Sequence, residues 1–142
     1  MAFSFDQHGF LANPTLHDGF VDGLLLEDEK RATVLLRTVG GEKFKMQLNG
    51  VEAFVCDDFR QGNIILHIQI FSGIAPDDNS LGRLYGPPHP SAAQEYHDRY
   101  KLLLTQKIEK IKEGLLSLVA IDPSYGCDLR SICQEVIITA YR

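Results

Sequence analysis

The chain has 142 residues, of which 44% are hydrophobic and 23% charged, and its formal net charge at pH 7 is −5. This length and composition exclude a disordered chain and predict one domain, residues 1–142, with a core that needs neither disulfides nor a structural metal. The negative charge argues against DNA or RNA as a partner, because nucleic-acid-binding domains normally carry a basic stripe.

The start of the chain and its apolar runs carry no targeting or membrane signal. The first eight residues lack the basic and long apolar regions of a signal peptide. The longest apolar runs are far shorter than the ~20 residues that a membrane-spanning helix needs. We therefore expect a cytoplasmic protein of bacterial type that has no membrane partner.

Residues 20–71 show the period of two that is typical of β-strands, broken by glycine-containing turns. At the turn that contains Gly40 and Gly41, a loop of these two residues would place Phe44 opposite Arg37. A three-residue loop of residues 39–41 places Phe44 opposite Leu36 and puts Gly41 at the left-handed position that such loops favour, so we prefer it. The predicted strands are residues 20–26, 33–38, 43–48, 51–56 and 64–71.

The last of these strands is the most apolar. Its even-numbered residues, Ile64, Leu66, Ile68 and Ile70, are expected to form one unbroken core face.

Residues 72–90 contain four of the six prolines and are predicted to be a long loop. Ser91 and Gln94 have the spacing of a capping box, which predicts one long helix over about residues 91–113 with Gly114 as its stop. Its apolar stripe, from Tyr96 to Leu115, is expected to pack on the sheet. Strands at 115–121 and 132–141, separated by a loop at 122–128, complete an α+β fold: a mostly antiparallel sheet of about seven strands packed against one long helix.

No catalytic motif stands above background, so we expect a protein that is not an enzyme and has no cofactor. The three cysteines lack a CxxC pair, which indicates no standard zinc site, although a transient bridge between Cys127 and Cys133 stays open. The alternative is a metal or small-molecule site that uses His17, Asp18 and His67. Neighbouring residues on a strand point to opposite faces, so this site requires a bend at Leu16–Gly19 that brings His17 and Asp18 together.

Acidic and aromatic residues suggest a surface for a protein partner. Arg83 and Tyr85, in the long loop, are residue types that anchor protein contacts. Acidic groups nearby in sequence favour a basic partner through electrostatic attraction. The partner-binding residues that we predict are Asp57, Asp58, Phe59, Asp77, Asp78, Arg83 and Tyr85.

Three short segments, Leu16–Gly19, Asn49–Val51 and Gly62–Leu66, lie among the predicted strands. Together they resemble small bacterial β-rich domains of unknown function, some of which are regarded as immunity proteins of polymorphic toxin systems. The resemblance covers about residues 15–72 and implies a non-enzymatic protein that blocks a partner toxin by surface contact. It supplies no site residues. A homodimer through the sheet edge or the helix face is a further possibility.

Overall fold

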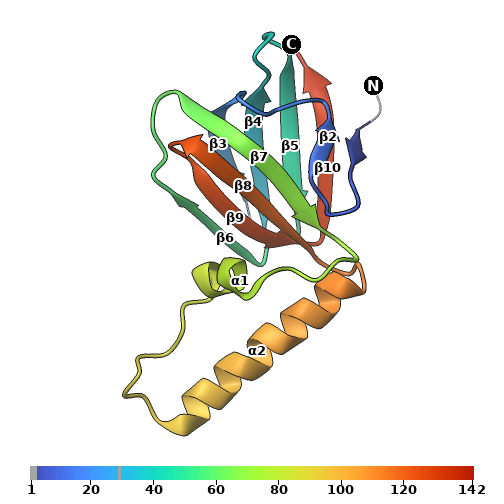
Figure 1. Cartoon of the computed structure of the whole chain (residues 1–142). Helices are drawn as coiled ribbons and strands as arrows, with labels where there is room; N and C mark the ends of the chain where they lie inside the picture. Colours follow the sequence, from blue (N-terminus) through green and yellow to red (C-terminus); the bar gives the residue numbers. More distant parts are fainter. Residues whose placement is uncertain (1–2, 29) are drawn as a thin grey trace.

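The computed structural model describes residues 3–28 and 30–142, and within them only the side chain of Asp78 is left out. The described part of the chain folds into ten strands and two helices (Figure 1). In chain order these are β1 (Ser4–Phe5), β2 (Leu11–Asn13), β3 (Phe20–Glu27), β4 (Arg31–Arg37), β5 (Lys43–Asn49), β6 (Ala53–Asp57), β7 (Asn63–Phe71), α1 (Asp78–Leu84), α2 (Gln94–Lys112), β8 (Ser117–Tyr125), β9 (Asp128–Cys133) and β10 (Glu135–Tyr141).

The main sheet is antiparallel and has the strand order β10-β5-β4-β3-β7-β8-β9-β6, while β1 and β2 form a separate hairpin. Only two residue pairs, Phe20 with Ile64 and Val21 with Asn63, join β3 to β7. Because this junction is so short, the sheet folds over there into two layers. Figure 1 shows β7, β8, β9 and β6 lying in front of β3, β4, β5 and β10. The α+β class and the antiparallel sheet are thus confirmed.

The main core fills the space between the two layers. Val34, Phe44 and Met46 come from the back layer, and Val119 and Leu129 come from the front layer, and all five are fully buried. The register that builds the back half is the predicted one: Phe44 pairs with Leu36, and Thr38 closes the three-residue loop by bonding to Glu42. A shift of one residue would have turned this apolar face to solvent.

The prediction for the strand 64–71 was wrong in one respect. Irregular pairing on either side of Ile65 interrupts the alternation of β7. As a result Ile65 is buried and Leu66 is exposed, whereas Ile68 is buried and His67 faces outward on the front layer, as the alternation predicts. A β-bulge of this kind adds one residue to one strand and re-aims the side chains that follow.

The strand count was also too low: the main sheet has eight strands rather than about seven. Residues 122–128, predicted as a loop, belong mostly to β8 and the start of β9, which turn tightly at Gly126. The predicted strand 132–141 is in fact the end of β9 and the whole of β10.

The helical region differs from the prediction at both ends of the segment 72–93. Residues 78–84 form α1, whose N-cap is Asp77, instead of a plain loop. The capping box at Ser91 is absent: α2 is capped at Ala93 without a side-chain hydrogen bond. Gly114 does follow the helix with a positive φ of 78°, as predicted. Neither described helix is both long enough and apolar enough to cross a membrane.

The long helix also does not lie over the sheet. Figure 1 shows α2 projecting away from both layers, with only its C-terminal end near the strands. Its apolar contacts with the body come from Leu104, Ile108 and Ile111, which join a second, smaller core with Phe71 and Leu118.

Candidate functional site

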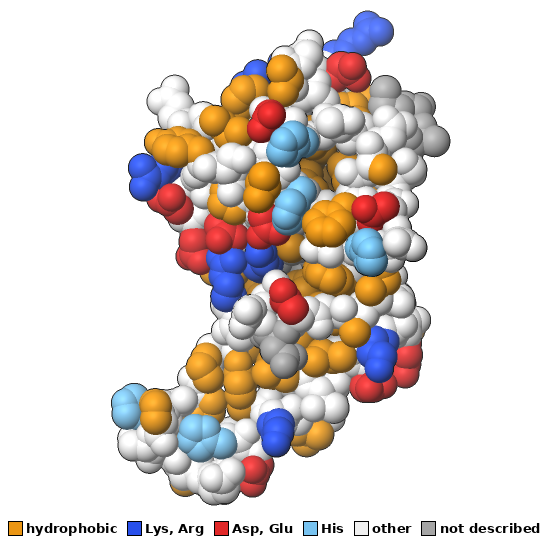
Figure 2. Space-filling view, in the orientation of Figure 1, with side chains coloured by type: hydrophobic (Ala, Val, Ile, Leu, Met, Phe, Trp, Pro, Cys, Tyr) orange, Lys and Arg blue, Asp and Glu red, His pale blue; other side chains and the backbone are white. Residues whose placement is uncertain are grey.

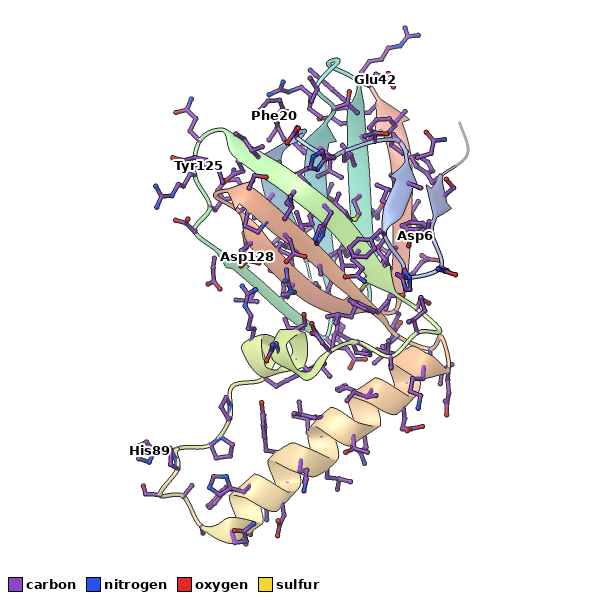
Figure 3. All side chains as sticks on the ribbon, viewed as in Figure 1. Asp6, Phe20, Glu42, His89, Tyr125 and Asp128 are labelled. Carbon is purple, nitrogen blue, oxygen red and sulfur yellow. The ribbon has the colours of Figure 1, made fainter. Side chains whose placement is uncertain are left out.

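Four polar residues form a row across the outer face of the front layer. His67 on β7 is paired with Asp122 on β8, and Asp57 on β6 is paired with Asp128 on β9. Asp122 and Asp128 are adjacent in register, because Ile121 pairs with Leu129 on antiparallel strands, and Asp122 follows Ile121 whereas Asp128 precedes Leu129. Side chains directly opposite on antiparallel strands lie close together. The register therefore brings three carboxylates and one imidazole side by side, and we call these four residues the aspartate row. Asp128, one of the four, is labelled in Figure 3.

Arg130, on the same face of β9, holds the row together. Its side chain is 10% exposed, and it makes an ion pair with Asp122 and another, 3.0 Å long, with Asp128. It also donates to the hydroxyl of Ser80 on α1 and to the backbone oxygens of Ile121 and Leu129. A buried guanidinium is tolerated only when its charge and its donors are matched in this way.

Arg83 of α1 completes the cluster. Its guanidinium lies 2.9 Å from Asp128 and 2.9 Å from Asp57. The hydrogen bond to Asp128 raises the pKa of Arg83 against the lowering effect of partial burial, and the bond to Asp57 adds to the increase. Arg83 and the bond between Arg130 and Ser80 thus fasten α1 to β6 and β9.

The region after α1 forms an arm, by which we mean residues 86–112, that is, the connecting segment and α2. Every residue of α2 is described, and Ile111 alone is buried. One stripe of the helix carries Tyr96, Tyr100, Leu103, Leu104, Ile108 and Ile111. Exposure increases along this stripe toward the free end, from 0% at Ile111 to 51% at Tyr96. Tyr100 and Leu103 are thus partly buried, and Tyr96 is the residue of the stripe that is exposed.

The base of the arm is fixed to the body by a polar contact as well as by the small core. Lys107 forms an ion pair with Glu52 and lies 5.9 Å from the ring centre of Tyr85. Burial has the largest effect and lowers the pKa of Lys107, but the hydrogen bond to Glu52 and the interactions with Tyr85 together outweigh it, so that the pKa is raised overall. Burial also raises the pKa of Tyr85. These contacts hold the inner end of α2 in one position.

The charged cluster and the arm lie on either side of a hollow. Figure 2 shows acidic and basic side chains together on the body, hydrophobic side chains along the arm, and a concave surface between them. Tyr100 approaches α1, since its hydroxyl oxygen lies 3.7 Å from the position of a Cβ at Gly82. An open surface with charged groups on one side and aromatic groups on the other can accept a partner.

The alternative site at His17, Asp18 and His67 is only partly assembled. The predicted bend exists, since Gly19 bonds back to Leu16 and Asp18 has a positive φ of 63°. However, His17 Nε2 is 3.6 Å from Asp18 Oδ2, beyond hydrogen-bond length, and His17 Nδ1 bonds to the backbone oxygen of Leu66.

His67 instead lies beside the aspartate row. Its Nδ1 atom is 3.1 Å from Asp122 Oδ2, although the direction of approach is not that of a hydrogen bond. Its ring also packs edge-on against Phe10. Across the described residues, no group of three His, Cys, Asp or Glu side chains is placed to hold a metal ion.

The predicted partner-binding residues are close to the hollow, but several already have partners within the chain. Asp57 bonds to Arg83, Asp58 bonds to Arg60 at 2.7 Å, and Asp77 accepts a hydrogen bond from the backbone of Ser80. Phe59 is exposed, and Arg83 and Tyr85, predicted to be exposed, are half-buried. The side chain of Asp78 lies outside the described residues.

The residues that sequence reasoning missed are Asp122, Asp128 and Arg130. Two of them were assigned to a loop, and the third was not considered. A signal was present, because Arg130 is the one charged residue in the segment from Leu129 to Cys133, which is mostly apolar. A charge in such a position has to be paired when the strand is buried.

The chain matches no protein-family model, and no curated protein and no solved structure is significantly similar to it.

Proposed function

We propose that this chain is a non-catalytic protein-binding domain that holds its partner in the hollow between the arm and the aspartate row. The observation that carries the proposal is the apolar stripe of α2, which continues from the buried Ile111 to a free end where Tyr96 is 51% exposed. A helix that presents an apolar face to solvent is a common element of protein recognition.

The composition of the surface supports this role. Tyrosine and arginine are enriched among the residues that dominate binding energy at interfaces. Here Tyr96 and Tyr100 lie on the arm, and Arg83 lies on the facing side of the hollow. The ion pairs of Arg83 fix its guanidinium before any partner arrives, so that little conformational entropy is lost there on binding.

The charge around the hollow favours a basic partner. The nearby aspartates, including Asp58 at the surface, outnumber the arginines that pair with them. Such a rim mainly accelerates association and makes it sensitive to salt. A toxin neutralised by surface contact, as the resemblance to immunity proteins implies, is one partner of this kind.

The proposal is tested by comparing two substitutions on the same helix. Tyr96→Glu places a charge on the exposed end of the stripe. Leu102→Glu places the same charge on the opposite side of α2, where the side chain is similarly exposed, at 57% compared with 51% for Tyr96. Each variant and the wild type are used to capture proteins from a lysate of the source organism at low and physiological salt.

We expect one stoichiometric protein with the wild type and with Leu102→Glu, and its loss with Tyr96→Glu. In the purified complex, Asp58→Asn should slow association and reduce its salt dependence, whereas Glu42→Asn, in the distant loop between β4 and β5, should change neither. Equal capture by Tyr96→Glu and Leu102→Glu would show that the stripe is not the binding surface.

A further inference from the structure

A pocket of about 420 Å³ opens where the two layers of the sheet come apart. On one side is β10, whose described hydrogen-bonding neighbour is β5 alone. On the other side are the ends of β7 and β8, and residues 3–5 lie across the opening, where Phe3 packs edge-on against Phe44 of the core. We call this the seam pocket. It is separate from the hollow beside the arm, because no residue of α1, α2 or the aspartate row lines it.

Six of the eight described residues that line the seam pocket are apolar, and the other two are serines. Phe3, Phe5, Ile70, Ile137 and Ile138 form most of the wall, and none of its described lining residues is Asp, Glu, Lys, Arg or His. The volume falls in the range of about 300–1,000 Å³ that is usual for small-molecule sites. Covering an apolar wall of this kind lowers the free energy of the system. An ion, in contrast, would lose its hydration there without meeting an opposite charge.

Two hydroxyl groups stand at one end of this wall. Phe71 pairs with Leu118, so Ser72 and Ser117, the next residues along each strand, lie opposite each other. Both line the pocket. Neither side chain has a hydrogen bond to any other residue in the part of the chain that the structure describes. A hydroxyl can both donate and accept, so this end of the pocket can bind one polar group of a ligand.

We propose that the seam pocket binds a small neutral amphiphile, that is, an apolar ring or chain that carries one uncharged polar group such as a hydroxyl or carbonyl. The apolar part lies against the phenylalanine and isoleucine side chains, and the polar group bonds to Ser72 and Ser117. The absence of charge among the lining residues selects against carboxylates and amines of the same size.

The first test uses two fluorescent probes that differ mainly in charge. N-phenyl-1-naphthylamine is neutral, and 8-anilino-1-naphthalenesulfonate has a related ring system with a negative charge. We expect saturable binding of one neutral probe per chain, at least tenfold tighter than binding of the anionic probe. No saturable binding of the neutral probe, or equal affinity for the two probes, would overturn the proposal.

Substitutions then locate the site. Ile137→Asp puts a carboxylate into the wall at a residue that is already 39% exposed, and it should weaken binding of the neutral probe at least tenfold. Val39→Asp, at a more exposed apolar residue far from the pocket, should leave binding unchanged. If circular dichroism shows that Ile137→Asp does not fold, Phe5→Ala replaces it, because Phe5 is half-exposed and its ring lines the pocket. Unchanged binding in the folded variant would place the probe elsewhere.

The serine pair is tested with 1-decanol as a competitor of the neutral probe. Ser72→Ala should weaken the affinity for 1-decanol by several-fold to about tenfold, since it removes one hydrogen bond to the alcohol. The affinity for the apolar part of the ligand, measured with decane, should not change. Equal loss for both competitors would contradict the role assigned to the hydroxyls.

Discussion

Replacing Arg130 with methionine should destabilise the protein more than any comparable change at the surface. The methionine side chain can occupy the path of the arginine stem but cannot supply its charge or its donors. The substitution therefore leaves Asp122 and Asp128 without their shared cation and the hydroxyl of Ser80 without its donor. Asp128 keeps its bond to Arg83.

The size of the loss follows from how buried the partners are. Removing one member of a fully buried ion pair costs about 3–5 kcal/mol. Here the side chains of Asp122 and Asp128 are 27% and 31% exposed, so water can solvate part of the charge that is left. We therefore expect Arg130→Met to lower the free energy of unfolding by about 2–4 kcal/mol.

Urea denaturation followed by circular dichroism measures this loss, and a double-mutant cycle assigns it. Asp122→Asn and the double variant should show a coupling energy with Arg130→Met of about 1–3 kcal/mol. Arg37→Met is the matched control, because Arg37 also forms an ion pair with an aspartate, Asp22, but in a more exposed position. A loss for Arg130→Met no larger than that for Arg37→Met would refute the reasoning.

Two further predictions concern the turn that precedes β9. The sulfur atoms of Cys56 and Cys127 are 3.3 Å apart, so mild oxidation with diamide should form a disulfide between these two residues. Peptide mapping identifies the bond, and a disulfide from either of them to Cys133 would contradict the geometry. Burial raises the pKa of both thiols, so the thiolate is scarce at neutral pH and the rate of oxidation should still be rising at pH 9. Gly126→Ala should lower the free energy of unfolding by more than about 2 kcal/mol. A Cβ at this position would lie 2.3 Å from the Asn63 side chain, and the positive φ of the residue adds backbone strain. Gly41→Ala, at a positive φ with open space around it, should cost only about 1–2 kcal/mol, and equal losses at the two positions would show that the contact is unimportant.

The back layer of the sheet could be predicted because two local signals agreed there. The alternation of residues 43–48 and the loop glycine at position 41 allow one register that keeps Phe44 and Met46 inside. Both signals depend on neighbouring residues in the chain. The structure confirms this register because it is the one that buries the apolar face.

The candidate site could not be predicted in the same way, because contacts between distant segments create it. Arg83 meets Asp128 across 45 positions of the chain, and Arg130 meets Ser80 across 50. The bulge in β7, which buries Ile65 and exposes Leu66, depends on pairing with β8 and leaves no mark on the local pattern. The stripe of α2 was predicted correctly from Tyr96 to Ile111, whereas Leu115, its predicted end, lies beyond the helix and is 61% exposed. Periodicity shows only that one side of the helix is apolar and does not say what covers it.

The central claim, that a partner protein binds the free end of the stripe, is tested most directly by photo-crosslinking in cells of the source organism. A photoreactive phenylalanine analogue is placed at Tyr96 in one variant and at Leu102 in another. If the partner binds the stripe, we expect a crosslink to one other protein from position 96 and none, or far less, from position 102. Equal crosslinking from both positions, or a product made only of two copies of this chain, would contradict it.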